Sequence, residues 1–142
     1  MGKIKWTRVL FGGLLAGVIA NVLGLTTWGI YLGKIWSAEL ETLGHPLPQT
    51  AGFLVLGVLL YFVIGILSVL LYVAIRPRFG PGPKTASLAG ITFWVLSGLL
   101  PTVSWGSLRL FPARLLAIDV LTYLVIVVVA TLLGAWIYKE EA

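Results

Sequence analysis

Four long apolar runs, separated by short segments that carry most of the charged residues, dominate the pattern along this chain. They lie near residues 8–32, 51–75, 86–107 and 114–138. Each is long enough for the roughly 20 residues that a helix needs to cross the hydrocarbon of a bilayer. The alternating segments of a membrane β-barrel are missing. The pattern predicts an all-α fold, an integral membrane four-helix bundle in a single transmembrane domain over residues 1–142.

Two connections between the runs have patterns of their own. Near residues 35–43, Trp36, Leu40 and Leu43 fall on one helical face before Gly44, which predicts a short separate helix lying in the membrane interface. Residues 76–84 are rich in Pro and Gly, so we expect a non-helical turn there.

The two halves of the sequence resemble each other, which predicts two parallel two-helix repeats related by an axis along the membrane normal. Small residues at helical spacing mark the faces on which the helices should pack. The similar segments are 16–19 and 89–91, 27–29 and 104–106, and 71–76 and 135–139. The small-residue faces are Gly13, Gly17, Ala20 and Gly24; Gly57, Gly65 and Ser68; Ser87, Gly90, Ser97, Gly98 and Pro101; and Ala130 and Gly134.

Composition excludes several classes of protein. Of the 142 residues, 59% are hydrophobic and 11% charged, against about 45–50% and about 25% in soluble domains. A chain this short has no interior in which to bury that excess, so lipid must be its solvent. With no cysteine and one histidine, disulfides, thiolate chemistry and a multi-histidine metal centre are excluded, and we expect no cofactor.

The formal charge of +5 is better explained by membrane orientation than by nucleic acid, because the basic residues lie at the ends of the apolar runs. Lysine and arginine concentrate on one side of the predicted bundle, which places both termini in the cytoplasm. That side carries Lys3, Lys5, Arg8, Arg76, Arg78, Lys84 and Lys139, whereas the other carries Lys34, Arg109 and Arg114.

Asp119 is the main candidate for chemistry, because it lies inside the fourth apolar run. An ionised carboxylate in hydrocarbon is costly unless it is paired or hydrated. One reading is a structural ion pair, with Arg114 and Arg109 as the nearest partners in the sequence and Lys34 as a third. The other reading is a ligand or ion site.

Further polar and aromatic residues fall at the depth of Asp119, in the outer half of the predicted spans, with Pro101 at the same level. If they face inward, the bundle holds one ligand-binding pocket that opens to the outside, with Trp28 and Trp105 at its mouth. Asn21, near the middle of the first run, is expected to form a hydrogen bond between helices. The candidate ligand-binding residues are Asp119, Arg114, Arg109, Asn21, Tyr123, Thr27, Trp28 and Trp105.

The element Gly33-Lys34-Ile35-Trp36 and the stretch 111–115, Phe-Pro-Ala-Arg-Leu, carry a resemblance. At both places the chain is similar to a family of uncharacterised small bacterial four-helix membrane proteins. The resemblance implies a multi-pass protein of the bacterial cytoplasmic membrane, and it implies no activity.

The residues favour a non-catalytic membrane protein that binds or transports a small molecule or lipid in the outer pocket. The alternative is an accessory or structural subunit of a larger membrane complex. An embedded enzyme is disfavoured, since Asp119 is the one serious titratable candidate. The expected partners are membrane lipids, with a homo-oligomer or a larger complex as further options and no nucleic acid.

Overall fold

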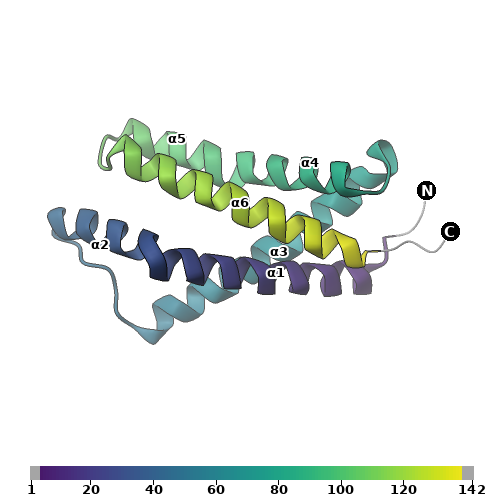
Figure 1. Cartoon of the computed structure of the whole chain (residues 1–142), viewed down its shortest axis with the longest axis horizontal. Helices are drawn as coiled ribbons and strands as arrows, with labels where there is room; N and C mark the ends of the chain where they lie inside the picture. Colours follow the sequence, from purple (N-terminus) through teal and green to yellow (C-terminus); the bar gives the residue numbers. More distant parts are fainter. Residues whose placement is uncertain (1–3, 139–142) are drawn as a thin grey trace.

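The computed structural model describes residues 4–138, and these form the predicted all-α four-helix bundle (Figure 1). All four helices are long and apolar enough to cross a membrane. The first helix consists of α1 (Trp6–Thr27), the π-helical turn η1 (Trp28–Leu32) and α2 (Gly33–Thr42). The second helix is α3 (Ala51–Phe79), and the fourth is α6 (Ala113–Ile137). The third helix consists of α4 (Pro83–Trp94), the π-helical turn η2 (Val95–Leu99) and α5 (Leu100–Ser107).

A helix is present near 35–43, as predicted, but this segment, α2, continues the first helix without a break from Trp6 to Thr42 and is not separate from it. Helical hydrogen bonding continues through η1, where the Gly33 N–H donates to the Trp28 carbonyl. At 1.5 Å per residue the helix is about 55 Å long. It therefore exceeds the roughly 30 Å of hydrocarbon, and its α2 end extends past that layer or the helix is strongly tilted.

The connection predicted as a non-helical turn over 76–84 is also shorter than expected. The helix α3 continues through Pro77 to Phe79, and α4 begins at Pro83. Proline is tolerated at both places, because a helix end has few backbone bonds to lose and the first helical N–H needs no partner. Gly80 and Gly82 make the remaining bend with φ of +81° and +127°, which other residues rarely adopt.

Small residues bring the helices together, as predicted. A Cβ at Gly13 would lie 2.6 Å from the Ile66 Cα, and one at Gly17 would lie 2.9 Å from the Phe62 Cα. A Cβ at Gly134 in α6 would lie 2.6 Å from the Gly12 carbonyl oxygen. The backbone of α1 thus touches both α3 and α6. Gly57 is an exception to the prediction, because it faces open space.

The four helices alternate in direction along the chain, as consecutive spans with short connections do. In Figure 1, α1 and α4–α5 run in one direction and α3 and α6 in the other. Gly17 packs on α3, and Gly90 packs on α6, where a Cβ would lie 3.1 Å from the Val128 Cα. Gly17 and Gly90, which resemble each other in sequence context, thus each contact the second helix of their own half of the chain.

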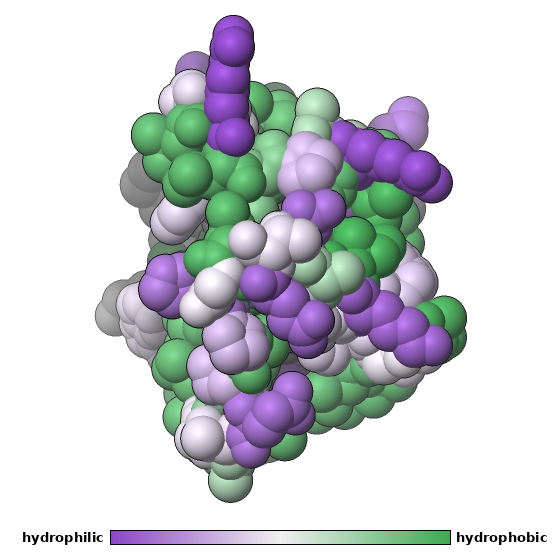
Figure 2. All heavy atoms as spheres, turned by 90° about the vertical axis from the view of Figure 1, so that its left-hand side faces the viewer, coloured by the Kyte–Doolittle hydropathy of each residue, from purple (hydrophilic) through white to green (hydrophobic). Residues whose placement is uncertain are grey.

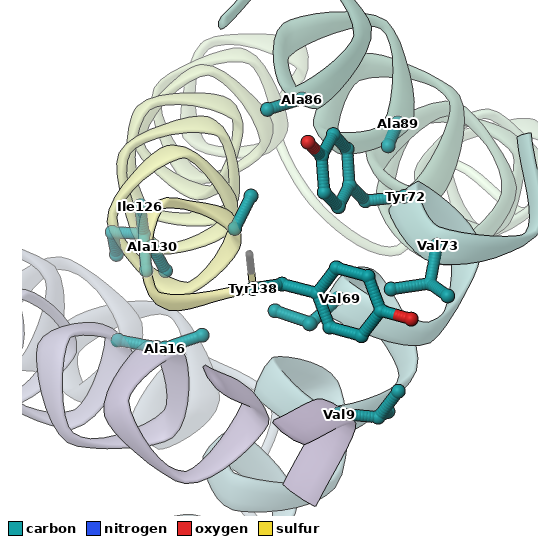
Figure 3. Packing of buried hydrophobic residues seen from close by; sticks show 12 residues of the cluster. Val9, Ala16, Val69, Tyr72, Val73, Ala86, Ala89, Ile126, Ala130 and Tyr138 are labelled. Carbon is teal, nitrogen blue, oxygen red and sulfur yellow. The ribbon is translucent and has the colours of Figure 1, made fainter. Parts of the chain in front are cut away.

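The buried core lies toward the end of the bundle where α1 begins and α6 ends, which we call the terminal end (Figure 3). Val69 and Val73 of α3 meet Val9 of α1 there. Tyr72 packs edge-on against Tyr138, with ring centroids 6.5 Å apart. Toward the other end, α3 diverges from the bundle (Figure 1), and no residue of α3 before Gly65 is buried. The helices are thus closed at the terminal end and open at the opposite, distal end.

Candidate functional site

A groove at the distal end contains three of the predicted site residues. It has a volume of about 400 Å³ and lies between α2, η2–α5 and α6. We call it the Asp119 groove. It is lined by Trp36, Ser97, Gly98, Pro101, Thr102, Trp105, Phe111, Leu116, Asp119, Val120 and Tyr123.

Asp119 is half-buried in this groove, and a tryptophan from another helix contacts it. The Trp36 Nε1–H donates a hydrogen bond to Asp119 Oδ1, with 3.4 Å between the two atoms. The Trp36 ring also packs edge-on against Phe111, with centroids 5.1 Å apart. The packing fixes the indole, so α2 supplies both a hydrogen-bond donor and an aromatic wall to the groove.

The structural ion pair considered for Asp119 is not formed. Among residues 4–138, Asp119 makes no salt bridge, and Trp36 is its one hydrogen-bond partner. Arg114 lies about 140° around α6 from Asp119, at about 100° per residue. Arg114 and Arg109 are both exposed and neither lines the groove. Figure 2 shows that hydrophilic side chains gather among apolar ones at the distal end of the bundle.

The π-helical turn η2 shapes the wall of the groove opposite α6. This widened turn comes just before Pro101, which has no backbone N–H and so cannot donate the hydrogen bond of a regular α-helix. Ser97 in this turn forms a 3.0 Å hydrogen bond with the Tyr123 hydroxyl. Ser97 thus ties the π turn of the third helix to α6 beside the groove.

The other π turn, η1, explains why sequence reasoning missed Trp36. Tyr31 bonds the Thr122 hydroxyl at 2.6 Å, and Trp36 bonds Asp119, although more than one α-helical turn separates the two aromatic residues. The extra residue in a π turn brings both toward α6. In a regular α-helix, the side chains of Tyr31 and Trp36 would lie on different faces. The Gly33-x-x-Trp36 element was the available signal, but nothing in the sequence predicted the π turn before it.

The remaining predicted residues lie elsewhere, so the expectation of one pocket for all of them is wrong. Asn21 is buried, and its Nδ2 donates to the Val58 carbonyl of α3 at 3.3 Å, which confirms the predicted interhelical hydrogen bond. Thr27 lines a groove between α1 and α6 and donates to its own helix backbone. Trp28 lines a third groove, between α1 and α3. Residue counting did not give the helix faces on which these residues lie.

The length of α6 indicates where the Asp119 groove lies along the membrane normal. The rise from Asp119 to Ile137 along the helix is about 27 Å, close to the roughly 30 Å thickness of the hydrocarbon. An α6 that crosses the hydrocarbon and ends at one boundary would bring Asp119 close to the other boundary.

The groove suits binding better than catalysis. It presents one carboxylate, hydroxyl groups and several aromatic rings, and a small number of polar groups on apolar walls is typical of ligand sites. Within the described part of the chain, no group of three or more His, Cys, Asp or Glu residues could hold a metal ion.

Comparisons with known proteins assign no family to the chain. No protein-family model, curated protein or solved structure matches it.

Proposed function

We propose that this chain is a non-catalytic, multi-pass membrane protein that binds a small molecule or a lipid headgroup in the Asp119 groove. The observation that carries the proposal is the half-buried Asp119 carboxylate. It has no cationic partner among the described residues, and its one hydrogen bond comes from Trp36 on another helix. Ionisable side chains within membrane-spanning helices are rare and often mark functional sites, which supports the proposal.

The open distal end supports this proposal. Close packing of small residues is concentrated toward the terminal end, so the distal grooves are not closed by helix contacts. We place the termini in the cytoplasm on the distribution of lysine and arginine. The groove then faces the outside of a bacterial cytoplasmic membrane, as the family resemblance implies.

The test is native mass spectrometry of the full chain released from its own membranes. Bound small molecules or lipids should copurify with the wild type. They should be lost from Thr102→Phe, which fills the groove with a bulky side chain. Gly57→Ala is the matched control, because it alters a glycine that faces open space outside the groove and should retain the bound molecules. Equal retention by all three proteins would contradict the proposal.

A second candidate, an accessory subunit of a larger membrane complex, is favoured by the first part of α3. Its residues before Gly65 are not buried, and Gly52 and Gly57 face open space. Small residues on an exposed face of this kind permit close approach of another helix. Proteins that copurify with the wild type, and are lost when Gly57 is changed to Leu, would support this function.

A further inference from the structure

The chemistry of the Asp119 groove narrows its ligand to one class. The groove presents the Asp119 carboxylate as its one ionisable acid, and no lysine, arginine or histidine lines it. Arg109 and Arg114 are exposed outside it. An anionic ligand would meet a like charge with no compensating cation. A cationic ligand would supply the charge that Asp119 lacks.

The hydrogen-bonding groups of the groove restrict the ligand further. The Trp36 N–H already donates to Asp119, and the hydroxyls of Ser97 and Tyr123 bond each other. A ligand with many acceptors would find few donors here. The second carboxylate oxygen, Oδ2, accepts no hydrogen bond from the described residues. It is therefore available to a positive charge.

Aromatic rings form much of the remaining wall. Trp36, Trp105, Phe111 and Tyr123 all line the same groove. The faces of such rings attract cations, and cages of aromatic rings recognise quaternary ammonium groups. A carboxylate beside several rings combines charge neutralisation with apolar contact, and this suits an alkylated ammonium better than a small, strongly hydrated metal ion.

We infer that the Asp119 groove binds an organic cation, an alkylated ammonium group held between Asp119 and the rings of Trp36, Trp105, Phe111 and Tyr123. The inference rests on the proposed function of the groove and names its ligand class. The ammonium could come from a free small molecule or from the headgroup of a lipid. Both sources present the same chemistry to Asp119.

The experiment uses the full chain in a maltoside detergent and isothermal titration with choline. Its neutral isostere, 3,3-dimethylbutan-1-ol, replaces the nitrogen by carbon and keeps the shape. Choline should bind saturably and at least about tenfold more tightly than the isostere, because both the carboxylate and the rings favour the charge. The absence of saturable choline binding, or equal binding of the two compounds, overturns the inference.

Variants connect the binding to the groove. Asp119→Asn should weaken choline binding at least about tenfold. Glu41→Gln is the matched control, because it removes an exposed carboxylate from the distal end outside the groove and should change nothing. Trp36→Leu, which keeps Asp119 and removes one ring, should weaken choline binding more than it weakens binding of the isostere, because only choline loses the attraction between the ring and a charge. It tests the inference even if Asp119→Asn fails to fold. Unchanged choline binding in a folded Asp119→Asn or Trp36→Leu overturns the inference.

Nanodiscs separate the two sources. If a lipid supplies the ammonium, choline should bind more weakly in phosphatidylcholine nanodiscs than in nanodiscs of a neutral glycolipid, because the phosphatidylcholine headgroup competes and neither surface carries a net charge that attracts choline. If a free molecule is the ligand and the headgroup does not enter the groove, the affinities should agree. Should choline not bind while native mass spectrometry still finds a molecule lost from Thr102→Phe, the ligand class is wrong and the proposed function stands. If no molecule copurifies and choline also does not bind, both fail.

Discussion

The substitution Gly65→Ala tests the packing of α3 on α1, with Gly57→Ala in the same helix as its control. A Cβ at Gly65 would lie 2.6 Å from the Gly13 carbonyl oxygen and 2.7 Å from the Gly17 Cα. The Gly17 nitrogen would lie closer still, and ordinary contact begins at 3.4 Å, so the helices must separate by more than about 0.8 Å or distort. Overpacking of this kind costs about 2 kcal/mol. At Gly57 nothing lies within 4 Å, and we expect a change within roughly 0.5 kcal/mol.

The assay is equilibrium unfolding in mixed micelles, with helicity followed by circular dichroism as a denaturing detergent replaces a mild one. Gly65→Ala should unfold at a clearly lower fraction of denaturing detergent than the wild type and Gly57→Ala. Since both variants make the same chemical change in one helix, intrinsic helix propensity cancels. If the two variants unfold together, the close contact between α1 and α3 is refuted.

Two further predictions concern particular contacts. Changing Tyr31 to Phe and Thr122 to Val, singly and together, should give a coupling free energy of about 0.6 kcal/mol in the same unfolding assay, because their hydroxyls are 2.6 Å apart; zero coupling would contradict this hydrogen bond. Gly80→Ala should destabilise the chain by about 1–3 kcal/mol, because the glycine has φ of +81° and ψ of 167°, a region essentially restricted to glycine; a variant as stable as the wild type would show that the bend between α3 and α4 is formed differently.

The fold was predictable because its main features depend on length and polarity. Four apolar runs specify four spanning helices whatever the details of packing. Gly13, Gly17 and Gly65 also marked real contacts, since few other residues allow such close approach in lipid. Pro77 misled the prediction of a helix end, because proline near the last turn of a helix removes little hydrogen bonding.

The site was only partly predictable, because residue counting gives depth along a helix but not direction around it. Asp119 and Tyr123 share a face at regular α-helical spacing, and both line the groove. Thr27 and Trp28, predicted for the same pocket, line different grooves. Trp36 reaches Asp119 only after the π turn η1 changes the direction of the helix face, and such turns have no simple sequence signature.

The prediction that the Asp119 groove opens on the outside of the membrane, opposite the termini, is open to one direct measurement. The chain has no cysteine, so a single Thr102→Cys variant reports on the groove without background. A membrane-impermeant maleimide should label it in intact cells, whereas Lys84→Cys at the terminal end should react only after the membrane is permeabilised. Labelling of Lys84→Cys in intact cells, with Thr102→Cys protected until permeabilisation, would contradict this orientation.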